Sequence, residues 1–172
     1  MMTNNLRTGI IEGFKILGIY QIIGGIIGLG FLFLSLSQLS GLSILPVLIS
    51  LISFVLFSYS ILCGILLLKK KPLGLRHSMI NQFLQLIFFT FLGYSFHYIA
   101  GVFFTLGIDL TDSFLLTFNI GLSSWQMEIS SGSPAINLNF NLVAFMLIIF
   151  IINLKAKVED QWLRDKIAEI GN

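Results

Sequence analysis

The stretch KKKPLGLRH, residues 69–77, separates two long apolar runs at 46–68 and 78–100 with a concentration of positive charge. Cytoplasmic connections between membrane helices carry an excess of Lys and Arg, because cationic side chains do not stay in hydrocarbon. The stretch therefore predicts an inner loop that joins two membrane helices and orients the rest of the chain. The inner basic patch expected at this loop consists of Lys69, Lys70, Lys71 and Arg76.

The composition indicates a membrane protein. Of the 172 residues, 56% are hydrophobic and 10% are charged, and the mean hydropathy is +0.94. A soluble domain has about 25% charged residues, so a soluble core does not account for this chain. A membrane helix needs roughly 20 apolar residues. Four such windows follow one another at 16–36, 46–68, 78–100 and 140–157.

These windows predict an all-α integral membrane protein, a four-transmembrane-helix bundle that forms a single domain over residues 1–172. All 10 Lys and Arg side chains fall in segments that we assign to the cytoplasmic side. The charged residues of the outer segments are Asp109, Asp112 and Glu128. We therefore expect a multi-pass protein of the cell membrane with both termini in the cytoplasm, where residues 158–172 form a helical tail.

The outer segment, residues 101–139, changes from helical to alternating periodicity. Apolar residues occupy the even positions of 114–122, then odd positions up to 129, and alternate with Asn from 136 to 141. This alternation predicts a small extracytoplasmic β-hairpin between the third and fourth helices, with its turn at 131–134. In the register that pairs apolar with apolar residues, Trp125 lies opposite Phe140.

Small residues mark one face of the first helix and one face of the second. Gly24 and Gly28 form a GxxxG pattern, which allows another helix to approach closely. This face is expected either to pack within the bundle or to form the seam of a homodimer. The helix-packing candidates on the two helices are Gly18, Gly24, Gly25, Gly28, Ser53 and Gly64.

Four amide side chains lie near the inner ends of the first and third expected helices: Gln21, Asn81, Gln82 and Gln85. At matching depth they could line a polar vestibule for a solute. The commoner role of such residues is to hydrogen-bond to one another or to the backbone and so to join helices. Both interpretations remain open from the sequence.

Four further candidates lie on the outer side. His97, Asp109 and Asp112 carry the ligand types of a divalent cation site. Their spacing is not diagnostic, and an interfacial histidine with two loop aspartates explains it as well, so we predict neither a metal nor a cofactor. Trp125 is expected to form part of an outer binding surface or to anchor at the membrane interface.

The pattern of charges and cysteines argues against several functions. The central parts of the expected spans contain no ionisable Asp, Glu, Lys, Arg or His, whereas pumps usually keep such groups there. Cys63 is the single cysteine, which excludes dithiol chemistry within the chain. We expect a non-enzymatic assembly or accessory subunit of a membrane complex. Its partners would be the lipid bilayer and a second copy or another membrane protein, and not nucleic acid. The alternative is a passive channel or facilitator for a small solute that uses the inner amides.

Overall fold

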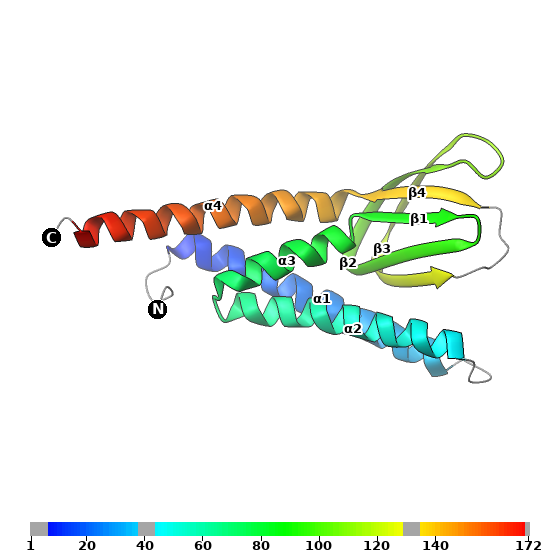
Figure 1. Ribbon diagram of the computed structural model, residues 1–172, viewed down its shortest axis with the longest axis horizontal. Helices are drawn as coiled ribbons and strands as arrows, with labels where there is room; N and C mark the ends of the chain where they lie inside the picture. Colours follow the sequence, from blue (N-terminus) through cyan, green and yellow to red (C-terminus); the bar gives the residue numbers. More distant parts are fainter. Residues whose placement is uncertain (1–6, 38–43, 129–134, 171–172) are drawn as a thin grey trace.

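The computed structural model describes residues 7–37, 44–128 and 135–170, which form four helices and a four-stranded antiparallel sheet (Figure 1). The elements follow in the order α1 (Thr8–Ser37), α2 (Ile44–Leu68), α3 (Pro72–Leu84), β1 (Ile87–Phe91), β2 (Tyr94–Asp109), β3 (Leu115–Glu128), β4 (Ile136–Asn141) and α4 (Leu142–Ile170). The fold is therefore α+β, and the prediction of an all-α bundle of four membrane helices is wrong.

The long helices α1 and α2 include the first two expected spans. They pack against each other as an antiparallel pair (Figure 1). α1 has 30 residues and α2 has 25, and both are rich in apolar residues. Within the described part of the chain, they are the two helices long and apolar enough to cross a membrane. At 1.5 Å per residue they measure roughly 45 and 37 Å, more than a hydrocarbon layer of about 30 Å.

The third expected span, 78–100, is not a helix along its length. Instead, α3 begins at Pro72 and ends at Leu84, so Arg76 belongs to this helix and not to a loop. The chain then forms β1 and β2, joined by Leu92 and Gly93, which both have positive φ (47° and 89°). Two such residues make the type I′ turn that suits a tight hairpin. An unbroken apolar run does not distinguish a buried strand from a helix, which explains the error.

The fourth expected span, 140–157, is also wrong as a membrane helix. Helix α4 is apolar only as far as Leu154, a rise of roughly 20 Å, and then continues through the charged tail to Ile170. Asn141 ends β4 and caps α4 directly, since its Oδ1 accepts hydrogen bonds from the backbone N–H groups of Val143 (3.1 Å) and Ala144 (3.4 Å).

The sheet has the strand order β1-β4-β2-β3. β1 pairs with the beginning of β2 and also with β4, which in turn pairs with the end of β2. All these pairs are antiparallel, so the two ends of β2 run in opposite directions and β2 folds back on itself. The reversal coincides with a register shift between Ile99 and Val102 and with Gly101, whose φ of +122° favours glycine.

The predicted register of the outer hairpin is wrong as well. Trp125 lies opposite Tyr98 on β2, whereas Phe140 lies opposite Ile87 and Leu106. β3 and β4 are not neighbours, because β4 lies between β1 and β2. The expected turn at 131–134 is outside the described residues. The strands exist, but β3 pairs with β2 and β4 pairs with β1 and the end of β2. β1 and the first half of β2 lie in the segment that was assigned to the third helix.

The two ends of the molecule differ. Both termini and the connection from α2 to α3 lie at one end, and the sheet lies toward the other (Figure 1). At the first end, α1, α2, α3 and α4 share a core formed by Ile10, Phe14, Leu17, Leu67, Leu75, Ile151 and Leu154. Smaller cores lie between α2 and the sheet (Phe57, Tyr98, Ala100) and within the sheet (Phe88, Ile99, Phe103).

Candidate functional site

The four predicted amides lie together, each at most 1% exposed, where α1, α2 and α3 meet the sheet. On the helical side, the Ser78 hydroxyl donates to Gln21 Oε1 (3.1 Å). Asn81 Nδ2 donates to the Ser60 hydroxyl (3.1 Å), which itself donates to the backbone carbonyl of Gln21 (3.0 Å). We call this group, with Gln82 and Gln85, the amide cluster.

The amide cluster also reaches the sheet. The Tyr98 hydroxyl has one hydrogen to donate and lies within reach of two acceptors, the carbonyl of Leu56 (2.8 Å) and Asn81 Oδ1 (3.1 Å). The Gln85 side chain accepts a hydrogen bond from the backbone N–H of Ala100 (2.9 Å), while the Gln85 carbonyl accepts one from Asn141 Nδ2 (3.1 Å). The cluster therefore connects the helices to β2 and to the start of α4.

Several polar atoms of the amide cluster have no hydrogen-bond partner within the described protein. They are Gln21 Nε2, Gln85 Nε2 and both Gln82 side-chain atoms. A buried polar group left without a partner costs about 1–3 kcal/mol. The amide cluster thus holds more hydrogen-bonding capacity than the packing of the helices uses.

The predicted small-residue face of α1 lies against two different elements. A Cβ on Gly18 would lie 3.0 Å from the carbonyl of Gly64, and one on Gly25 would lie 2.8 Å from the carbonyl of Phe57, so these glycines lie against α2. Gly28 lies against the Phe57 ring. Ser53, also buried, donates to the carbonyl of Ile49 in its own helix (2.8 Å).

Gly24 lies against the sheet. A Cβ there would lie 2.5 Å from the backbone of Ala100 and Gly101. The Ser123 hydroxyl of β3 donates to the Gly24 carbonyl (2.8 Å) and accepts from the Gly101 N–H (2.9 Å), and the Tyr20 hydroxyl donates to a neighbouring β2 carbonyl. We call these contacts the α1–sheet joint. The joint was not predicted from the sequence, although a glycine inside a strand often marks a bulge or a close backbone approach.

The outer candidates do not form one site. His97 Nε2 lies 2.6 Å from the Ser124 hydroxyl, and its ring stacks on Phe88 with centroids 4.4 Å apart. Burial lowers the pKa of His97 to about 4, so the imidazole is neutral at pH 7. Asp109 lies at the other end of β2, where hydrogen bonds from Thr111 lower the pKa of its carboxyl. Asp112 is exposed beyond it, and the described residues contain no group of three His, Cys, Asp or Glu placed to hold a metal.

Trp125 borders a pocket of about 400 Å³ between α1, α2 and β3. Its ring packs against Phe96 and Tyr98 at centroid distances of 5.9 and 6.2 Å. The walls that α1 and α2 contribute are mostly apolar, and Ser35 and Ser50 are their polar residues. Trp125 therefore joins the sheet to the helices more than it forms an outer surface.

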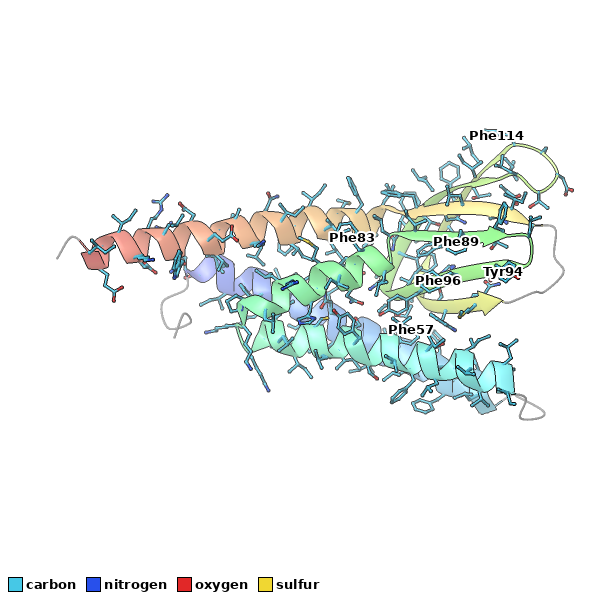
Figure 2. All side chains as sticks on the ribbon, viewed as in Figure 1. Phe57, Phe83, Phe89, Tyr94, Phe96 and Phe114 are labelled. Carbon is cyan, nitrogen blue, oxygen red and sulfur yellow. The ribbon has the colours of Figure 1, made fainter. Side chains whose placement is uncertain are left out.

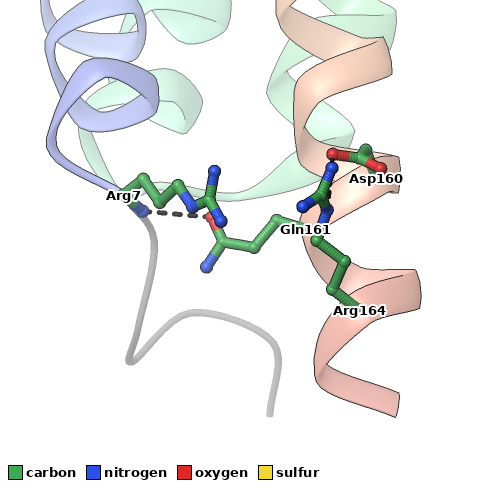
Figure 3. A network of polar contacts seen from close by, with 4 residues as sticks. All are labelled: Arg7, Asp160, Gln161 and Arg164. Carbon is green, nitrogen blue, oxygen red and sulfur yellow. Dashed lines mark hydrogen bonds and ion pairs between the residues drawn. The ribbon is translucent and has the colours of Figure 1, made fainter. Parts of the chain in front are cut away.

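The basic patch lies at the end that carries the termini. Lys69 and Lys71 are exposed and Lys70 is half-buried in the connection between α2 and α3, and Arg76 is exposed on α3. At the same end, the backbone N–H of Arg7 donates to Gln161 Oε1 of α4 (3.0 Å; Figure 3). This hydrogen bond ties the start of α1 to the tail.

The edge of the sheet is formed by β3, a strand of 14 residues whose one strand partner within the described residues is β2. Its first half, up to Leu122, exposes large apolar side chains, and no charged residue occurs before Glu128.

No protein-family model, curated protein or solved structure matches this chain. The site must therefore be interpreted from its own geometry.

Proposed function

We propose that the protein is a non-enzymatic assembly or accessory subunit of a membrane complex, in which the edge of β3 accepts a strand from a partner. The observation that carries this proposal is the length of the strand at the edge of the sheet, which has no charged residue from Leu115 to Met127. Natural proteins protect such edges with lysines, prolines, bulges or short strands, because unpaired N–H and C=O groups bind other strands. The half of β3 from Leu115 to Leu122 has no lysine and no proline.

The location supports the proposal. α1 and α2 are proposed to cross the cell membrane, which makes the protein multi-pass. The three lysines at 69–71 lie at the same end as both termini (Figure 1). Basic residues collect on the cytoplasmic side. The orientation that we propose has both termini in the cytoplasm and the sheet toward the opposite side.

The orientation is tested by labelling single cysteines in intact cells, in a Cys63→Ala background. A membrane-impermeant maleimide should modify Asp112→Cys from outside and spare Lys69→Cys. Both positions are exposed, so the difference reports the side of the membrane. Modification of Lys69→Cys with sparing of Asp112→Cys would reverse the proposed orientation.

The assembly role is tested with two neighbouring prolines, Phe118→Pro and Asn119→Pro. Along an antiparallel strand, successive N–H groups point to opposite edges, so one of the two variants loses a bond to β2 and the other loses only the outward donor. The variant that loses only the outward donor should keep the thermal unfolding midpoint of the wild type. In mild detergent it should run at the mass of the single chain and not at the mass of the complex. If the stable variant keeps the wild-type complex mass, the edge of β3 is not the assembly surface.

The second candidate is a passive channel or facilitator, and the unpaired atoms of the amide cluster favour it. In proteoliposomes, swelling in urea or glycerol measures the flux of a small solute. A channel through the amide cluster predicts flux that Gln82→Leu abolishes, because this variant removes two unpaired polar atoms. Ser53→Ala is a matched control, since Ser53 hydrogen-bonds within its own helix. Wild-type protein without flux would leave assembly as the remaining proposal.

A further inference from the structure

Two rows of apolar side chains cross the whole sheet. One row is Ile87, Phe140, Leu106 and Phe118, taken from β1, β4, β2 and β3 in their spatial order. The next row on the same face is Phe89, Leu138, Ile108 and Leu116. Directly opposed residues of antiparallel strands share a face, so these rows form one continuous apolar face.

The face formed by the two rows points away from the interior. Phe118, Leu116 and Leu138 are 67%, 59% and 55% exposed. The residues between the rows point to the other side, which is the inside of the curled sheet. That side contains Phe88 (3% exposed) opposite Asn139, and Thr105 (2%) opposite Asn141 (1%). The two outward rows are thus entirely apolar, whereas the inward side holds Thr105, Asn139 and Asn141 together with Phe88; Asn119, at the edge strand, is exposed.

The arrangement is the reverse of a sheet in water, where the apolar face covers a core and the polar face is solvated. Strands in lipid show apolar side chains outward and polar side chains inward. Asp109 is the one charged residue of β1, β2 and β4; it lies at the end of β2 opposite Leu115 and Asn137, and so belongs to neither apolar row. The solvent that suits this face is hydrocarbon.

The apolar face also has no polar rim toward the helices. The Phe140 ring contacts Phe145 of α4 with a centroid distance of 5.6 Å, and the next residue along α4, Met146, is 68% exposed. Below β1, Phe83 of α3 is 55% exposed. Figure 2 shows these apolar side chains around the helices and the sheet alike, with Phe83, Phe89 and Phe114 labelled on α3, on β1 and at the connection after β2.

A protein interface has a bounded core surrounded by a polar rim. Here the apolar surface instead continues from the sheet onto α3 and α4, and the exposed faces of α1 and α2 are apolar as well. We infer that the outward face of the sheet is in contact with the acyl chains of the bilayer. Hydrocarbon tolerates no open sheet edge, so this inference requires the edge of β3 to be paired, as the proposed function has it, whichever chain supplies the strand.

The test places nitroxide labels on single cysteines of the full-length protein in phosphatidylcholine vesicles, in a Cys63→Ala background. Phe118→Cys and Ile120→Cys report the outward face, and Thr117→Cys reports the inward face of the same strand. Asp112→Cys is the control in water. Oxygen, which concentrates in hydrocarbon, and a nickel chelate, which stays in water, serve as collision reagents.

The labels at 118 and 120 should collide more with oxygen and less with the chelate than the label at 112, while the label at 117 should not show this gain. Two outward positions are used because one variant could fail to fold, which size-exclusion chromatography would reveal. Greater collision with the chelate at 118 and 120 would place the face in water. Protection from both reagents would mean that a protein covers it, and either result would overturn the inference.

Discussion

Gly24 and Gly30 lie on the same helix, and the structure predicts opposite effects when each is replaced by Ala. A Cβ on Gly24 would lie 2.5 Å from Ala100 C and Gly101 N, whereas a Cβ on Gly30 would meet nothing within 4 Å. Carbon atoms prefer separations of about 3.5–4.0 Å, so the added methyl at Gly24 requires a shift of about 1 Å. The neighbour is backbone and cannot rotate away. Ser123 also ties it to Gly24, because its hydroxyl accepts from the Gly101 N–H and donates to the Gly24 carbonyl.

Overpacking of this kind costs about 1–3 kcal/mol. Ala also gains helix propensity over Gly, by about 1 kcal/mol or less, and this gain offsets part of the loss at Gly24. Gly24→Ala should therefore destabilise the protein by up to about 2 kcal/mol, and by about 1–3 kcal/mol relative to Gly30→Ala, in which the same helix gain cancels. Gly30→Ala should be neutral or stabilise it by up to about 1 kcal/mol, because its methyl meets no neighbour.

The assay is reversible unfolding in mixed detergent micelles, followed by the fluorescence of Trp125 in a Trp162→Phe background. Trp125 packs against the core that Phe57 of α2 forms with Tyr98 and Ala100 of the sheet, and so reports on the contact between the sheet and the helices. Equal free energies of unfolding for Gly24→Ala and Gly30→Ala would refute the reasoning. In that case α1 would not lie against the bend of β2 as the structure has it.

Three further predictions use the same unfolding measurement. Acidification from about pH 6.5 to pH 4 should lower the free energy of unfolding by up to about 3 kcal/mol. The reason is that the pKa of His97 is lowered in the folded state, so the unfolded chain binds the proton first. His97→Gln should flatten this pH dependence. Ser123→Ala should cost about 1–3 kcal/mol, since it leaves the Gly24 carbonyl and the Gly101 N–H without their partner, and full stability would contradict the α1–sheet joint. Gln161→Ala should lower the free energy of unfolding by about 1 kcal/mol and speed amide exchange at the start of α1. Arg164→Ala breaks an exposed ion pair with Asp160 and should change it by about 0.5 kcal/mol or less. A larger loss of stability for Arg164→Ala than for Gln161→Ala would contradict this prediction.

The sequence predicted where apolar segments lie better than which structure they adopt. The windows of α1 and α2 were visible because each is an uninterrupted apolar run that continues as one helix. The window 78–100 is also long and mostly apolar, but Thr90, Ser95 and His97 alternate within it with aromatic residues, and Gly93 supplies a turn. Alternation over a few residues was the only signal of β1 and β2, and the total hydropathy outweighed it.

The partner of a strand was harder to predict than the strand itself. The alternation from Phe114 to Leu122 lies in and just before β3, yet the partner was sought in the segment that follows rather than in the one that precedes. The amides were predicted as a group from their depth, and they do lie together. Which atoms of the amides stay unpaired depends on their contacts with Ser60, Ser78 and Tyr98. These contacts arise only in the fold, and no local sequence pattern predicts them.

The position of β4 between β1 and β2 affects the order in which the chain can fold. β1 and β2 are made early and can pair at once through their tight turn, but β4 is made after β3 and must then insert beside both. Until it does, one edge of β1 and the last part of β2 remain open, and contacts between segments distant in sequence form slowly. The nascent sheet is thus vulnerable to mispairing during synthesis, and its closure depends on the segment that leads directly into α4.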